Sequence, residues 1–160
     1  MKPFERRIYH SLGELLADLR NIVSRRKDVR ALMQGKIISP AFRERLMLVV
    51  TGVNGCRYCS YVHAREALAK GISQAEIEAL GKGMFGGSPL DEVTALLYAQ
   101  HWDETDGAPD GQARSFVVGR YGGQVVEMVE LALRIIRVGN LSGNTADFLL
   151  NRVSFGQWGG

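Results

Sequence analysis

Two cysteines and a histidine are the side chains whose types and spacing best suit chemistry. Cys56 and Cys59 are the only cysteines in the chain, and His63 follows one helical turn later. At about 100° of rotation per residue, the three positions lie within roughly 60° of one another on a helix. Two neighbouring thiols can oxidise to a disulfide, a helix N-terminus stabilises a thiolate, and a histidine can transfer a proton. The spacing therefore predicts a dithiol redox site.

Two other interpretations of the cysteine pair stay open. A Cys-x-x-Cys pair supplies half of many zinc sites, although the remaining histidines, His10 and His101, lie in separate segments without a paired spacing. The cysteines could also be buried and inert, because cysteine packs as a small hydrophobic residue. A non-catalytic oligomeric protein with structural cysteines is therefore an alternative to the redox interpretation.

The cysteines must be positioned by two helices that a glycine-rich break separates. The first helix begins at Ser39 and is interrupted at residues 52–55, and the second runs over residues 54–70. The cysteine pair thus falls at a helix start. Bulky residues of the second helix, Tyr58 and Tyr61 among them, lie toward its opposite side. We therefore expect the cysteine face to line a cleft or a second interface.

The rest of the chain has helical periodicity as well. Apolar residues recur at steps of three and four from Ile8 to Val23, and Ser11 with Glu14 forms a capping box near the start. The other signals are a capping box at residues 73–76, a helix start at 88–91, a loop at 105–111 and a mostly apolar, buried helix at 125–138. Few runs alternate as strands do. The sequence therefore predicts an all-α fold without an internal repeat or a linker.

Composition excludes several classes of protein. The 160 residues are 46% hydrophobic and 23% charged, which is typical of one globular domain. No apolar run approaches the roughly 20 residues of a membrane span, and the N-terminal residues lack the pattern of a secretory signal. The net charge of +3 is mild, and we interpret the basic run at residues 25–30 as a solvated helix end. We expect a cytoplasmic protein that binds neither nucleic acid nor membrane.

The residues around the cysteines resemble those of a known family. The stretch from Glu44 through residues 56–63 is similar to the alkyl hydroperoxidase D-like (AhpD-like) branch of the carboxymuconolactone decarboxylase superfamily. Its signature is a glutamate twelve residues before the first cysteine, followed by Cys-x-x-Cys-x-x-x-His, and all four positions are filled here. The likeness runs from about Ser39 to Asn151, including residues 95–99 and 139–144.

The resemblance implies a single-domain, all-helical AhpD-like fold that assembles as a homotrimer or homohexamer. Residues 39–160 would form the AhpD-like helical domain with the Cys-x-x-Cys motif. Residues 1–38 would form a variable N-terminal helical extension packed on that domain. A subunit of this type would carry its redox chemistry on its own side chains, so the resemblance implies no bound cofactor and no metal.

The resemblance also implies an antioxidant activity, that of a thiol-dependent alkyl hydroperoxidase or dithiol-disulfide oxidoreductase. Cys59 would attack the hydroperoxide, Cys56 would resolve the intermediate to a redox-active disulfide, and Glu44 with His63 would relay protons. The partners of such an enzyme would be a hydroperoxide substrate and an external reductant. A dithiol such as a dihydrolipoyl group, a thioredoxin-like protein or a small thiol would serve as that reductant.

The role of Glu44 rests on the resemblance alone. In the sequence, Glu44 lies between Arg43 and Arg45. This pattern is typical of a solvated helix residue that pairs with its neighbours. Glu66 is a local rival, because it follows His63 by three residues on the same helix and could orient the imidazole instead. Either carboxylate is compatible with a histidine that moves a proton.

One position departs from the pattern of the family. Well-known members have a second histidine between the cysteines, where this chain has Tyr58. Tyrosine is a poor proton carrier near neutral pH, because its reference pKa is about 10, so we expect a shorter relay and slower peroxidase turnover. The superfamily also offers an alternative reaction, decarboxylation of a lactone acid, with His63 and Glu44 handling protons and without use of the cysteine pair.

Overall fold

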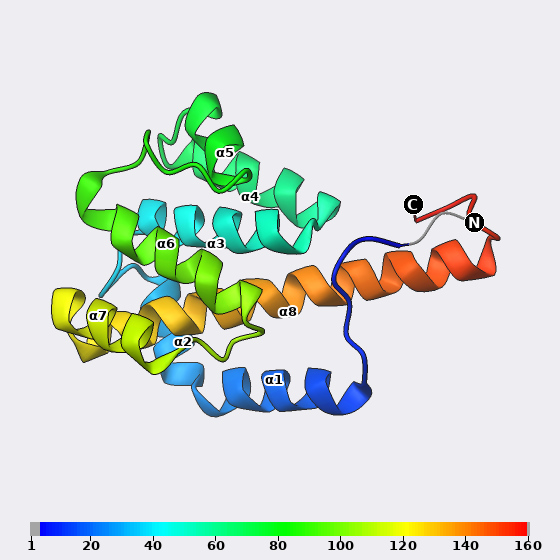
Figure 1. Ribbon diagram of the computed structural model, residues 1–160, viewed down its shortest axis with the longest axis horizontal. Coiled ribbons are helices and arrows are strands. Elements are labelled where there is room, and N and C mark those ends of the chain that lie inside the picture. Colours follow the sequence, from blue (N-terminus) through cyan, green and yellow to red (C-terminus); the bar gives the residue numbers. More distant parts are fainter. Residues whose placement is uncertain (1–3, 160) are drawn as a thin grey trace.

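The chain folds into helices connected by turns and loops (Figure 1). The computed structural model describes residues 4–159, and within this range it contains eight helices and no strand. The predicted all-α fold is therefore confirmed. The helices are α1 Leu12–Ser24, α2 Arg26–Met33, α3 Pro40–Asn54, α4 Arg57–Ala69, α5 Gln74–Leu80, α6 Leu90–Glu104, α7 Gly111–Tyr121 and α8 Gly123–Val153. In residues 4–159, no helix has the length and apolar character needed to cross a membrane.

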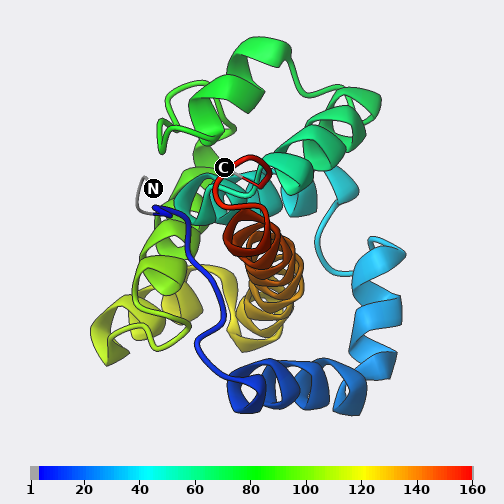
Figure 2. The same ribbon diagram turned by 90° about the vertical axis from the view of Figure 1, so that its right-hand side faces the viewer.

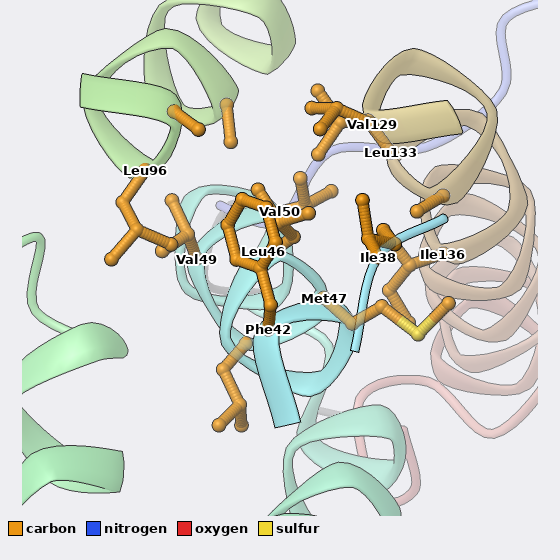
Figure 3. Packing of buried hydrophobic residues seen from close by; sticks show 14 of the residues in the cluster. Ile38, Phe42, Leu46, Met47, Val49, Val50, Leu96, Val129, Leu133 and Ile136 are labelled. Atoms are coloured by element: carbon orange, nitrogen blue, oxygen red, sulfur yellow. The ribbon is translucent and has the colours of Figure 1, made fainter. Parts of the chain in front are cut away.

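Helix α3 forms the centre of the hydrophobic core. It begins where the sequence predicts, with Pro40 in the first turn and the Ser39 hydroxyl accepting the Phe42 N–H at 3.1 Å. Its buried side chains, among them Leu46 and Val50, meet residues of α6 and α8 (Figure 3). Helix α3 also packs against α4 and α5. The helix that precedes the cysteines is thus held on several sides, which fixes the position of its C-terminal end.

Helix α8 runs the length of the molecule and is longer than the predicted helix over residues 125–138 (Figure 1). Beyond Val138 it continues through Gly139 and Gly143, because buried polar contacts hold this part in place. The Asn144 side chain donates to the backbone carbonyls of Arg7, at 2.9 Å, and Asn54, at 2.8 Å. The C-terminal half of α8 therefore joins the N-terminal segment to the end of α3.

Helix α1 differs from the expected buried stripe. Its N-cap is Ser11, whose hydroxyl accepts the Glu14 N–H at 3.2 Å as the capping box predicts. The predicted apolar stripe, however, does not face the core, and its most exposed members are Leu12, Leu16, Leu19 and Val23. Charge holds α1 in place instead, because the buried Asp18 accepts hydrogen bonds from Arg134 and Arg137 of α8. Figure 2 shows α1 and α2 on the outer side of α8.

Two helices were not predicted from the sequence. The basic run at residues 25–30 forms the N-cap and first turns of α2, a separate helix that buries Leu32 completely. Its many charged residues concealed the short apolar face. Helix α7 begins where the predicted loop over residues 105–111 ends, because the Asp110 side chain accepts the Ala113 N–H at 2.8 Å. In the sequence, the Asp and Gly residues around this cap are typical of a turn.

Candidate functional site

A left-handed glycine turn sets the start of the cysteine helix. Gly55 ends α3 with φ of 67°, a backbone conformation that favours glycine, and its N–H donates to the Thr51 carbonyl at 2.9 Å. The chain then reverses, and Cys56 becomes the N-cap of α4. The helix begins at Arg57, slightly later than the predicted start at residue 54 or 55.

The two cysteines form a buried pair of free thiols. Their Sγ atoms lie 2.8 Å apart, and Cys56 Sγ accepts the Cys59 N–H at 3.4 Å. Cys56 is 2% exposed and Cys59 is 8% exposed, whereas Tyr58 on the outer side of α4 is 75% exposed. The cysteine face of α4 is therefore turned into the core and does not line an open cleft. Gly143 of α8 leaves room for Cys56, since a Cβ there would lie 3.3 Å from its Sγ.

The surroundings separate the acidities of the two thiols. The pKa of Cys56 is lowered to about 6, chiefly by the hydrogen bond with the Cys59 thiol, which outweighs the effect of burial with help from the N–H groups of Cys59 and Tyr58. The pKa of Cys59 is raised, because its hydrogen bond to Cys56, burial and the charge of Cys56 all favour its protonated form. The resting pair thus holds its negative charge on Cys56.

Glu44 and His63 form a second pair, which joins α3 to α4. Glu44 is buried, and its Oε2 lies 2.8 Å from His63 Nδ1. Burial alone would raise the pKa of Glu44, but hydrogen bonds from His63 and Arg43 together outweigh it and lower that pKa. A charged Glu44 accepts a hydrogen bond from a protonated Nδ1 of His63. Nε2 of His63 is then left without a proton and can accept one. The expectation of a solvated Glu44 was therefore wrong.

The arginines beside Glu44 are almost buried too, and they have different partners. Arg43 donates to Glu44 Oε1 from Nη2, at 3.0 Å, so the predicted local pairing of Glu44 is correct for this neighbour. Arg45 turns away from Glu44. Its Nε donates to Glu76 at 2.7 Å, and its Nη1 donates to Glu92 at 3.1 Å. Sequence reasoning missed Arg43 as a member of the site, because its contacts depend on the unpredicted helix α2.

A comparison with known families finds a similarity over this region. Residues 25–100 match the model of the carboxymuconolactone decarboxylase family. The stretch is therefore similar to that family over a little under half of the chain. The match extends from the start of α2 into α6, and it includes Glu44, both cysteines and His63. A comparison with curated proteins and one with solved structures gave no match.

The other predicted residues lie outside the buried group. Glu66 is exposed, and within residues 4–159 it makes no hydrogen bond to His63. Tyr58 also faces outward, on the same helix. The carboxylate that orients the histidine is therefore Glu44 and not the local rival. In the described part of the chain, His63 makes no direct hydrogen bond to either thiol.

The remaining histidines stand apart from the cysteines. His10 is exposed in the N-terminal segment, and His101 of α6 pairs with Asp110, with Nε2 at 2.9 Å from Oδ2. Across residues 4–159, no group of three or more His, Cys, Asp and Glu side chains is arranged to hold a metal ion.

Proposed function

We propose that this protein is a thiol-dependent peroxidase, or dithiol-disulfide oxidoreductase, of the AhpD-like branch. The observation that carries the proposal is the pair of free thiols at the start of α4, 2.8 Å apart. The Glu44 and His63 pair, joined at 2.8 Å, supports it further, because it supplies a proton acceptor on the helix that carries Cys59. The four side chains match the signature that suggested this activity.

In the proposed reaction, a Cys59 thiolate attacks the terminal oxygen of a hydroperoxide. The O–O bond breaks, a sulfenic acid forms on Cys59, and the leaving alkoxide takes a proton to become an alcohol. The Cys56 thiolate then attacks the sulfur of Cys59, which forms the disulfide and releases water after a second proton is added. The dithiol thereby loses two hydrogens, and the hydroperoxide is reduced to an alcohol and water.

The resting charge on Cys56 requires a proton transfer before this attack. Cys59 must lose its proton, and Cys56 Sγ can accept it directly at 2.8 Å. Nε2 of His63, one helical turn after Cys59, is a second candidate acceptor, because Glu44 occupies Nδ1. Proton transfer from Cys59 to Cys56 leaves the nucleophile on the cysteine that the family resemblance assigns. The proton on Cys56 then passes to the leaving alkoxide, which returns Cys56 to the thiolate that attacks the sulfur of Cys59.

An external thiol completes the proposed cycle. A dithiol or a thioredoxin-like protein would reduce the disulfide, so no bound cofactor or metal is part of the proposal. Tyr58 and Tyr61 support docking of a reductant protein, because they are exposed on α4 and tyrosine is enriched in protein interfaces. A reducing compartment such as the cytoplasm would keep the pair in its dithiol form.

We also propose that the subunits assemble into homotrimers or homohexamers. The exposed apolar residues of α1 support assembly, because contiguous apolar surface commonly marks an interface. Sedimentation at micromolar concentration should give a particle several times heavier than one subunit. A monomer in that experiment would contradict the assembly.

The decisive experiment is the intact mass of the reduced protein before and after one equivalent of an organic hydroperoxide. We expect the mass of each subunit to fall by two hydrogens, because the dithiol becomes a disulfide. Cys59→Ser should abolish peroxide consumption. Cys56→Ser should consume one equivalent and stop at a sulfenic acid on Cys59.

The paired variants also test the assignment of roles. If Cys59→Ser consumed one equivalent and Cys56→Ser consumed none, the roles of the cysteines would be reversed. An unchanged mass in the wild-type protein, with peroxide left unconsumed, would refute the peroxidase.

A further inference from the structure

Arg43 connects the buried carboxylate of the site to a second helix. Its Nε and Nη2 donate to Glu44 Oε1, at 3.3 Å and 3.0 Å. Its Nη1 donates to the backbone carbonyls of Leu32, at 3.3 Å, and Met33, at 3.2 Å. These carbonyls belong to the last turn of α2, and that of Leu32 also accepts the Gly35 N–H at 3.1 Å. One guanidinium group thus spans α2 and the redox site.

The contacts of Glu44 divide cleanly between its two oxygens. Oε1 accepts from Arg43, and Oε2 pairs with Nδ1 of His63. With Oε1 anchored, the carboxylate cannot rotate without breaking a buried ion pair, which is costly because it leaves an uncompensated charge. The planar guanidinium suits this task, since its donors point in fixed directions toward the carboxylate and α2.

We propose that Arg43 is a positioning residue, which orients Glu44 so that His63 keeps its proton on Nδ1 and its Nε2 stays unprotonated. The contribution of Arg43 to turnover rests on the proposed function, whereas its control of the imidazole tautomer does not. The charged groups that face Glu44 are Arg43 from its own helix and His63 from α4. Helix α2 thereby supports the site although it carries no part of the Cys-x-x-Cys motif.

Arg45 provides a matched control on the same helix. Its side chain is 12% exposed and that of Arg43 is 11% exposed, and both make buried or half-buried ion pairs with carboxylates. The partners of Arg45 are Glu76 and Glu92, which lie outside the redox site. Loss of either arginine should lower stability. Only loss of Arg43 should alter the state of the histidine.

The test compares Arg43→Gln, Arg43→Lys and Arg45→Gln with the wild-type protein. The first measurement is nitrogen NMR of the two ring nitrogens of His63, assigned with a His63→Gln variant. The wild-type protein and Arg45→Gln should show a proton on Nδ1 and none on Nε2. Arg43→Gln should show a mixture of both tautomers. Arg43→Lys should give an intermediate mixture, because it keeps the charge but lacks the fork that reaches Glu44 and α2 together.

The second measurement is the pH dependence of peroxide consumption. Arg43→Gln should move the acid limb of the profile to higher pH, because burial then acts on Glu44 with one cation fewer. At a pH on that limb the rate should fall roughly tenfold, within the contribution of about 10² to 10⁴ made by positioned proton-transfer groups. Arg45→Gln should leave the limb in place.

A wild-type tautomer in folded Arg43→Gln would overturn the positioning role, and so would an equal change in Arg45→Gln. If Arg43→Gln does not fold, Arg43→Lys decides, since a wild-type tautomer there would equally overturn it. Failure of the proposed function is a separate result. In that case peroxide leaves the mass of the wild-type protein unchanged, while the histidine signals still report whether Arg43 orients Glu44.

Discussion

The acidity of Cys56 comes from where the residue sits on its helix. As the N-cap of α4, Cys56 places its Sγ against an N–H group that has no partner within the helix. Cys59 adds a thiol donor one turn later, at 2.8 Å. A negative charge on Cys56 is therefore stabilised by donors that are already in position. The same contacts hold the proton on Cys59.

Titration of the thiols should reveal this asymmetry. In the reduced wild-type protein, thiolate absorbance should rise with a pKa of about 6, because Cys56 loses its proton first. Cys56→Ser should remove that transition. Cys59→Ser should shift it to higher pH, because the thiol of Cys59 makes the largest contribution to lowering the pKa of Cys56. A transition near pH 6 that survives in Cys56→Ser would place the charge on Cys59.

The sequence indicates some of the site residues and conceals others. The spacing of Cys56, Cys59 and His63 predicts a shared helix face, because helical periodicity alone places them together. Glu44 was indicated only by the family resemblance. Its burial depends on how α3 packs against α4, which local sequence does not encode. Arg43 was missed for a similar reason, since half of its contacts are to the backbone of α2.

At the level of elements, helices with strong end signals were predictable. Helices α3 and α5 begin at serine caps that the sequence displays, and both caps make the expected hydrogen bonds. Helix α2 has a short apolar face among charged residues, so tertiary contacts reveal it better than periodicity does. The length of α8 was underestimated, because Gly139 and Gly143 resemble helix breakers in sequence. Buried contacts of the following turns hold those glycines in the helix.

Two helical glycines should respond to alanine in opposite ways. A Cβ on Gly52 of α3 would lie 2.5 Å from the carbonyl oxygen of Gly81 at the end of α5, so Gly52→Ala must push the two helices apart. We expect it to lower the free energy of unfolding by about 1–3 kcal/mol. Gly139 in α8 is exposed and has open space around it.

Gly139→Ala is therefore the matched control, and it should raise the free energy of unfolding by about 0.5–1 kcal/mol through helix propensity. Urea unfolding of both variants checks the pair. Equal stability changes of the same sign would show that the close approach between α3 and α5 has no energetic consequence.

At the level of the whole molecule, a buried ionic cluster ties distant segments together. Asp103 of α6 is fully buried, with Arg7 Nη1 at 3.4 Å from its Oδ2 and Arg137 Nε at 3.6 Å from its Oδ1. Arg137 also pairs with Asp18 of α1 at 3.1 Å. The cluster therefore joins the N-terminal segment, α1, α6 and α8. Charge that is buried in this way makes the stability of the molecule depend on pH.

The contribution of Asp103 to the free energy of unfolding should fall as the pH rises. Burial raises its pKa to about 6, although Arg7 and Arg137 oppose the shift. Because this value lies above that of an unfolded aspartate, about 3.9, the folded state binds more protons between the two values. The contribution of Asp103 to stability is thus fully present below about pH 4 and is lost as the pH rises through about 6. The whole loss is at most about 3 kcal/mol.

Asp103→Asn removes the titrating group while keeping the shape of the side chain. Relative to this variant, the wild-type protein should therefore lose stability between about pH 4 and pH 7. Urea unfolding across that range measures the difference. Asp106→Asn, which removes an exposed partner of Arg7 and Arg137, controls for the loss of a carboxylate from the same cluster. If the wild-type and Asp103→Asn curves stay parallel, the burial of Asp103 does not govern its proton affinity.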